Sequence, residues 1–208
     1  MKEEDILKPV ATKRKKSARL IKVAKSLPGS TIRSYPVEYT KKWKVDSQRV
    51  TIRPIRPEDE PLMVEFHQTL SDRSVYFRYF GTLSLTQRTG HERLRRACCI
   101  DYDREMALVA DHKDRTGGHH IVGVGRLIKE PGTDEAEFAI LVSDSWQGKG
   151  LGAELLGLLV QVGRKERVRR IFGHIVTENT AMRRVSEEVG FNLRFDDDEG
   201  EWKAEILL

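Results

Sequence analysis

SDSWQGKGLGAELL, residues 143–156, places three glycines at alternate positions, Gly148, Gly150 and Gly152, between an apolar run and a run of leucines. Glycine gives the backbone conformations that other residues rarely adopt and leaves the neighbouring amides open to a ligand. Amides at a helix N-terminus bind phosphate through hydrogen bonds and the helix dipole. The stretch therefore predicts a strand, a tight turn able to hold a phosphate group, and a helix that begins at this turn.

Two common phosphate-binding motifs do not fit this turn. A Walker A loop requires a Lys-Ser or Lys-Thr pair after its second glycine, whereas Lys149 lies between two glycines. The dinucleotide fingerprint requires a third glycine at position 153, which is Ala153. The turn must therefore serve a different phosphate ligand, if it serves one.

Charge is distributed unevenly along the 208 residues, whose formal net charge is +5. Residues 1–48 carry thirteen Lys/Arg and five Asp/Glu, whereas residues 49–208 carry twenty-four Lys/Arg and twenty-seven Asp/Glu. The sequence therefore predicts a basic N-terminal arm or linker over 1–48 and one domain over 49–208. The run from Lys13 to Lys16 can attract acidic partners, or it can form a solvated tail. Because the larger part lacks the pattern of a nucleic-acid recognition helix, we expect no nucleic-acid partner.

Neither a membrane nor a metal is indicated by the sequence. No apolar run approaches the roughly 20 residues that span a bilayer, and the first residues lack the apolar core of a secretory signal. The two cysteines, Cys98 and Cys99, suit a reducing compartment and are expected to be small buried hydrophobic residues. The histidines lack metal-ligand spacing, and His119 and His120 follow two glycines in a predicted exposed turn. We therefore expect a cytoplasmic protein with no membrane partner and no metal.

Hydrophobic periodicity predicts a mixed, mostly antiparallel α/β (α+β) sheet flanked by helices. Apolar and β-branched runs predict strands at 38–45, 50–55, 105–113, 120–130, 136–144, 169–176 and 201–208. Apolar residues at helical spacing predict helices at 57–70, 71–81, 84–99, 152–168 and 179–190, with Ser71 and Ser84 as candidate caps. The aromatic side chains Tyr76, Phe77 and Phe80 are expected to pack in the core, although they can also line an acceptor site.

The turn resembles the motif Q/R-x-x-G-x-G/A that binds the acetyl-CoA pyrophosphate in the GCN5-related N-acetyltransferase (GNAT) family. Its context is similar too: the strand ILVSD precedes it, a leucine-rich helix follows, and ENTAMRRVSEEVGF resembles the family's later asparagine-bearing helix. The resemblance covers roughly residues 49–208. It implies a GNAT fold and acetyl-CoA as co-substrate.

Three longer stretches resemble the acetyltransferase domain of the bacterial Pat-type protein lysine acetyltransferases. They are TIRPIRPEDEPLMVEFHQTLSDRSVYFRYF, IDYDREMALVA and GTDEAEFAILVSDSWQGKGLG. In that group the domain often follows a large segment related to acyl-CoA synthetases, which this chain lacks, so we expect a stand-alone relative or an excised domain. The resemblance implies acetyl transfer to a lysine of a protein such as an acyl-CoA synthetase. A small-molecule amine N-acetyltransferase and a non-catalytic acyl-CoA-sensing module remain alternatives.

A base is required for such a transfer. The pKa of a free lysine is near ~10.4, so forming its neutral amine at pH 7 costs roughly 4 to 5 kcal/mol unless a carboxylate accepts the proton. Strand alternation places Glu135 and Glu137 on one face, with Ala136 and Phe138 on the other. The Pat resemblance implies that Glu137 is the general base; a solvent-facing or ion-paired residue is the alternative. For Glu135, near the hairpin, the solvent-facing or ion-paired interpretation is preferred.

A proton donor for the leaving thiol is less evident. Many members of the broader family carry a tyrosine at the position that corresponds to Ser186. Since the pKa of a thiol is near ~8.5, it can leave largely as thiolate. Ser186 can hydrogen-bond the sulfur or can simply occupy space within its helix.

The remaining contacts to acetyl-CoA are assigned by role. Leu141 and Val142 would present backbone groups to the pantetheine arm as a strand-like partner. Asn179 is similar to the family's pantetheine-contacting asparagine and is also a candidate helix N-cap. Lys149 would add positive charge near the pyrophosphate. The backbone amides assigned to the pyrophosphate are those of Gln147, Gly148, Lys149, Gly150, Leu151 and Gly152.

Overall fold

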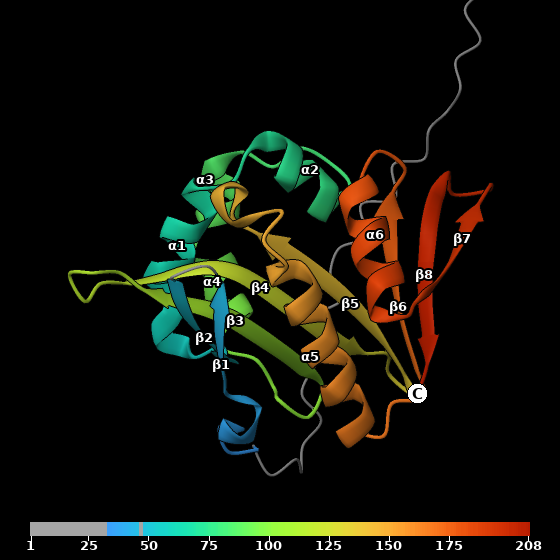
Figure 1. Ribbon diagram of the computed structural model, residues 1–208, viewed down its shortest axis with the longest axis horizontal. Helices are drawn as coiled ribbons and strands as arrows, with labels where there is room; N and C mark the ends of the chain where they lie inside the picture. The colour runs from blue at the N-terminus through green and yellow to red at the C-terminus, as the bar shows by residue number, and fades with distance from the viewer. Residues whose placement is uncertain (1–32, 46–47) are drawn as a thin grey trace, which may run out of the picture.

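The computed structural model describes residues 33–45 and 48–208 (Figure 1). Within these residues one sheet of eight strands has the order β1-β2-β3-β4-β5-β6-β8-β7. Neighbouring strands are antiparallel except for β5 and β6, which are parallel, so the predicted mixed sheet is confirmed. The strands are β1 (Lys41–Val45), β2 (Gln48–Pro54), β3 (Glu105–Lys113), β4 (His119–Lys129), β5 (Glu135–Val142), β6 (Arg170–Val176), β7 (Asn192–Asp196) and β8 (Glu201–Leu207). Residues 1–32 of the arm predicted over 1–48, with the run from Lys13 to Lys16, lie outside the described residues.

Helices cover both faces of this sheet. On one face lie α1 (Glu60–Gln68), α2 (Asp72–Tyr79), α3 (Leu85–Thr89) and α4 (His91–Cys98); on the other lie α5 (Leu151–Lys165) and α6 (Thr180–Val189). Short 3-10 turns are η1 (Val37–Tyr39), η2 (Pro57–Asp59) and η3 (Asp144–Trp146). The predicted caps are confirmed, since the side chains of Ser71 and Ser84 accept hydrogen bonds from the amides of Ser74 and Gln87.

Two expectations from the sequence are wrong at this level, and one strand is missed. The helix predicted over 84–99 is two helices, because Gly90 has an extended conformation (ψ 132°) that interrupts the helical path. Strand β7 was not predicted, because its residues are mostly polar and exposed and show no apolar alternation. Cys98 is buried, and its burial raises the pKa of its thiol to about 12, but Cys99 is exposed at the end of α4.

Close packing fixes α5 against β4. A Cβ placed on Gly123 would lie 3.1 Å from Leu151 Cδ2, and one on Gly125 would lie 3.3 Å from Leu159 Cδ1. Because Gly123 and Gly125 have no side chains, the buried leucines of α5 can pack directly against β4. This contact holds the N-terminus of α5 next to the end of β5.

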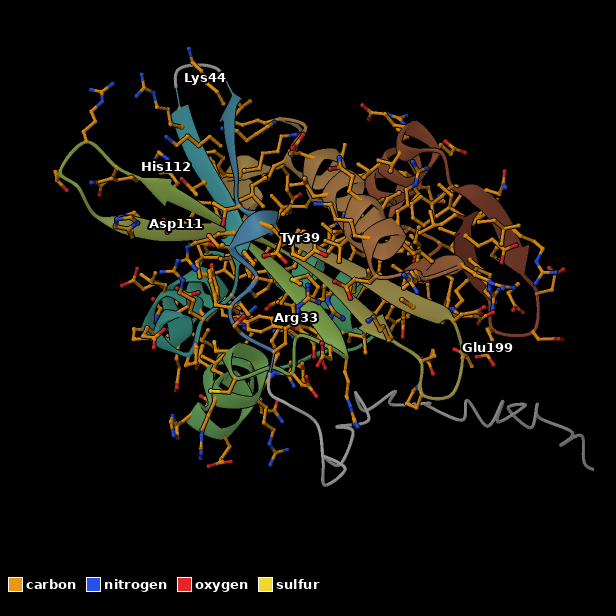
Figure 2. The ribbon with its side chains drawn as sticks, turned by 90° about the horizontal axis from the view of Figure 1, so that it is seen from below. Arg33, Tyr39, Lys44, Asp111, His112 and Glu199 are labelled. Atoms are coloured by element: carbon orange, nitrogen blue, oxygen red, sulfur yellow. The ribbon has the colours of Figure 1, made fainter. Side chains whose placement is uncertain are left out.

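A cluster of hydrogen bonds at the other end of α5 fastens the segment that leads into the sheet. Glu166 accepts hydrogen bonds from Arg33 Nη1 at 2.6 Å, from the Tyr39 hydroxyl at 2.8 Å and from Lys129 Nζ at 3.3 Å. Figure 2 shows Arg33 and Tyr39 in the N-terminal part of the described chain. Burial opposes ionisation of Glu166, but these three donors outweigh it and lower the pKa of the carboxyl.

Glu166→Gln is expected to be less stable than the unaltered protein above pH 5, with a smaller difference at lower pH. Because the folded pKa of Glu166 is depressed, its contribution is complete above the unfolded value and is lost as the pH falls through the folded value. The difference in melting temperature between the two proteins, measured from pH 7 to pH 3, tests this. Glu199→Gln, in the exposed β7–β8 turn (Figure 2), controls for the loss of one charge. A difference that stays constant with pH would contradict the assignment.

Candidate active site

Strands β5 and β6 diverge at the centre of the sheet. Their parallel pairing covers three residues of each strand: Glu135 with Arg170, Ala136 with Ile171, and Glu137 with Phe172. Figure 1 shows the two ribbons separating beyond this point, toward their C-terminal ends. Residues 138–142 pair with β4 on one side and have no strand partner on the other side among the described residues. Such an open strand edge can bind an extended, amide-bearing group as it would bind another strand.

Leu141 and Val142, predicted to present backbone groups to the donor, lie at the C-terminal end of this open edge. Both side chains are buried. The Val142 carbonyl oxygen accepts a hydrogen bond from the side-chain amide of Gln147 at 3.1 Å, and that amide also donates to Ser74 Oγ of α2 at 3.0 Å. The Gln147 side chain therefore fastens the turn to β5 and α2. Its backbone amide donates to the Asp144 carbonyl oxygen at 3.3 Å, so the expectation that this amide holds the pyrophosphate is wrong.

The glycine turn has the backbone geometry that the sequence predicts. Gly148 and Gly150 have φ angles of 71° and 84°, and a Cβ added to either would meet no atom within 4 Å. Gly150 is the N-cap of α5, and no side chain of the described residues caps this helix. The first helical hydrogen bond is donated by the Glu154 amide to the Gly150 carbonyl oxygen, so the amides of residues 151–153 have no partner within the helix. Open space and free amides together fit a diphosphate.

Lys149 is held beside this turn by an aromatic contact. Its ammonium nitrogen lies 5.4 Å from the centroid of the buried Trp146 ring, and the His112 ring packs against the same indole at 4.9 Å. His112 belongs to the long β3–β4 hairpin (Figure 2). The hairpin and η3 thus place a positive charge next to the free amides of α5.

The two glutamates of β5 lie in different environments. Glu135 forms an ion pair with Arg170 of β6, with Nε to Oε1 at 2.8 Å, and this contact lowers the pKa of Glu135. The half-buried Glu137, in contrast, has no ion pair or side-chain hydrogen bond within 33–45 and 48–208. Glu137 lies where the pairing of β5 and β6 ends. Its register with Ile128 places it on the sheet face that carries α1 to α4. It is therefore the carboxylate free to accept a proton.

Helix α6, which carries Asn179 and Ser186, packs against α5 on the sheet face opposite α1 to α4. Asn179 is the N-cap of α6, where its Oδ1 accepts a hydrogen bond from the Met182 amide at 3.1 Å. Ser186 is completely buried, and its hydroxyl has no hydrogen-bond partner in the described part of the chain. Buried hydroxyls usually have a partner, so this one is suited to bond a group that enters the site.

The aromatic residues of α2 are less buried than the sequence indicated. Tyr76 and Phe80 are 40% and 42% exposed, so the expectation of core packing is wrong for both. Phe80 ends the helix in a left-handed conformation (φ 56°), which turns its ring toward solvent. Arg78 and Arg93, which approach the ring of Tyr79 from two helices, were missed entirely. Each arginine looks like an ordinary helical surface residue in the sequence, and only the fold brings them together.

The described residues contain neither a candidate metal site nor a candidate membrane span. No group of histidine, cysteine, aspartate and glutamate side chains in residues 33–45 and 48–208 could hold a metal ion. No helix in those residues has the length and apolar character needed to cross a bilayer.

The fold and this site define the class of acetyl-CoA-dependent acetyltransferases. The chain belongs to the GNAT family, since the model of the acetyltransferase (GNAT) domain matches residues 49–192. Acetyltransferases of this family use acetyl-CoA, and the free amides, the open strand edge and the unpartnered Ser186 hydroxyl fit that donor.

Curated relatives and solved structures agree with this assignment. Acetyltransferase PA5475 of Pseudomonas aeruginosa is 32% identical over 155 residues, covering 74% of this chain and 81% of that protein. Acetyltransferase Pat of Mycolicibacterium smegmatis is 25% identical over 174 residues, covering 83% of this chain but 48% of Pat, so this chain spans about half the length of Pat. The GNAT domain of S. lividans PAT superposes with a TM-score of 0.74 at 25% identity, covering 84% of this chain and all of that one.

Proposed function

We propose that this protein transfers an acetyl group from acetyl-CoA to a lysine side chain of another protein, such as an acyl-CoA synthetase. The proposal includes the cytoplasmic location expected from the sequence. The observation that supports it most is the open edge of β5. This edge begins next to Glu137, which has no ion pair in the described residues, and ends next to the glycine turn, where no side chain of the described residues caps α5. Similarity to Pat and to the S. lividans PAT domain supports a protein acceptor.

Donor binding follows from the geometry of the opening. Acetyl-CoA supplies the activated thioester. Its pyrophosphate fits the amides of residues 148–152, with the charge of Lys149 nearby. Its pantetheine amides fit the backbone edge at Leu141 and Val142, with Asn179 on the facing helix.

Glu137 is the general base in this proposal. The acceptor ammonium gives a proton to the Glu137 carboxylate, directly or through one water, and the neutral amine nitrogen then bonds to the acetyl carbonyl carbon. The carbon–sulfur bond breaks, and its electron pair leaves with the sulfur. The attacking nitrogen also loses its second proton, which protonates the departing thiolate. The products are an acetylated amine, coenzyme A as the free thiol, and a protonated Glu137, which returns its proton to solvent.

Ser186 assists the leaving sulfur in this proposal. Its hydroxyl is buried and unpartnered, so it can donate a hydrogen bond to a thiolate without losing another bond. Because a thiol with a pKa near ~8.5 leaves readily, no stronger acid is required.

The test is transfer from labelled acetyl-CoA to proteins of a bacterial lysate, followed by identification of the modified lysines. Lysate with heat-denatured enzyme controls for non-enzymatic acetylation. Modification of specific protein lysines supports the proposal. Transfer to small amines alone would instead indicate a small-molecule N-acetyltransferase, and acetyl-CoA binding without transfer to any amine would indicate a sensing module.

A further inference from the structure

Four arginines lie on the sheet face that also carries Glu137. They come from four separate elements: Arg78 from α2, Arg88 from α3, Arg93 from α4 and Arg126 from β4. We call them the arginine cluster. They surround His67, which is 2% exposed; burial and the positive charges of all four lower the pKa of this imidazole to about 4. The cluster is therefore a region of strong positive potential with a neutral histidine at its centre.

Carboxylates balance only part of this charge. Arg126 forms an ion pair with Glu105 and donates a hydrogen bond to the Ala97 carbonyl. Arg78 and Arg93 lie 5.0 and 4.9 Å from the centroid of the Tyr79 ring, and neither has a carboxylate partner in the described chain. The face of an aromatic ring stabilises the positive charge of a guanidinium much less than a carboxylate stabilises it. These two half-buried guanidinium groups therefore form no ion pair in the described residues, although the charge of Glu137 acts on Arg78.

Of these two guanidinium groups, Arg78 lies close to the proposed base, and Arg93 approaches the same Tyr79 ring as Arg78. Helix α2 packs against β5, and Arg126 is paired in register with Ala139, two residues beyond Glu137 on the same face. Burial lowers the pKa of Arg78, the charge of Glu137 raises it, and Arg126 and Arg93 lower it. No hydrogen bond or ion pair joins Arg78 to Glu137 in the residues described, so both remain available to a substrate.

We propose that the acceptor carries a carboxylate close to its reacting amine and that Arg78 and Arg93 bind this carboxylate while Glu137 accepts the proton. This inference rests on the proposed transfer reaction. A guanidinium suits the role because its planar donors can bind a carboxylate in a bidentate manner. The carboxylate can belong to an acidic residue beside the target lysine of a protein, or to a small amine that is itself an acid.

The experiment compares acceptors that differ only in charge near the amine. Peptides with one lysine flanked by glutamate, by glutamine or by lysine are tested, together with small amines that have or lack a carboxylate, by release of coenzyme A. We expect kcat/KM to be at least about tenfold higher for the acidic member of the matching series than for its uncharged analogue, since charge-assisted hydrogen bonds have this magnitude. Equal rates, or a preference for basic flanks, would overturn the inference even where transfer itself is efficient.

Variants test whether Arg78 and Arg93 cause the preference for acidic acceptors. Arg78→Gln and Arg93→Gln should each reduce the acidic preference, mainly through KM, and Arg78→Lys should restore part of it. Arg95→Gln, at an exposed position of the same helix as Arg93, is the matched control and should retain the preference. A preference that survives the double change at Arg78 and Arg93 would exclude them as its source. Absence of transfer to every acceptor, with acetyl-CoA still bound, would contradict the proposed function rather than this inference.

Discussion

Glu137→Gln is expected to lower kcat for acetyl transfer by about 100- to 10,000-fold while leaving the Kd for acetyl-CoA unchanged. The amide has nearly the shape of the carboxylate but cannot accept the proton of an ammonium group. Because Glu137 lies at the point where β5 and β6 separate and has no ion pair in the described residues, its replacement should disturb little of the fold. Transfer rates and calorimetric binding of acetyl-CoA, measured on the same preparations, test this.

The pH profile gives a second test of the same residue. Without a base, the reaction depends on amine that is already neutral, and this fraction rises about tenfold per pH unit below the lysine pKa near ~10.4. The rate of the variant should therefore rise steeply with pH, while the unaltered protein levels off earlier. Glu135→Gln is the matched control on the same strand face: it breaks the ion pair with Arg170 and should lower stability rather than kcat. If Glu137→Gln transferred acetyl at pH 7 as fast as the unaltered protein, Glu137 would not be the general base.

Gly150→Ala is expected to weaken acetyl-CoA binding by about tenfold or more. An added methyl group would meet no atom of the described residues within 4 Å, but it would stand at the N-cap of α5, where the proposed function places the pyrophosphate. Losing one charge-assisted hydrogen bond to a phosphate would account for a change of this size. The left-handed backbone at Gly150 (φ 84°) adds about 1 to 2 kcal/mol of strain for any other residue.

Gly132→Ala separates the two effects. Gly132 has a similar φ of 79°, it also has no atom within 4 Å of an added Cβ, and it lies in the β4–β5 hairpin, away from the turn. Both variants should therefore lose similar stability in thermal unfolding, whereas only Gly150→Ala should lose affinity for acetyl-CoA. Equal affinities for the two variants would mean that the turn does not hold the donor.

Much of the fold follows from local patterns in the sequence. The strands around the glycine turn and helix α5 were predicted because β-branched runs and regularly spaced leucines are local signals. The break at Gly90 was missed because a single glycine within a helical pattern is often tolerated. Strand β7 was missed because it is held by pairing with β8 rather than by apolar residues of its own.

The candidate site was predictable only in part. Positions on one strand and its following turn, such as Glu137 and Gly150, are close in sequence, so strand and helix geometry fix their relation. The arginine cluster joins residues 78, 88, 93 and 126 from four elements, and no local pattern relates them. The ion pair that distinguishes Glu135 from Glu137 depends on Arg170, which is distant in sequence and enters only through the parallel pairing of β5 with β6.

The open edge of β5 also determines how long the donor must be. Five residues, 138–142, separate the end of the β5–β6 pairing from the end of the strand, and at about 3.3 Å per residue they span roughly 17 Å. A donor anchored by its anionic end at the glycine turn can place its thioester beside Glu137 only if a flexible arm of about this length joins the two. A short acetyl thioester can reach either the glycine turn or Glu137, but it cannot reach both at once. The length of one strand thereby discriminates among thioesters independently of any single side chain.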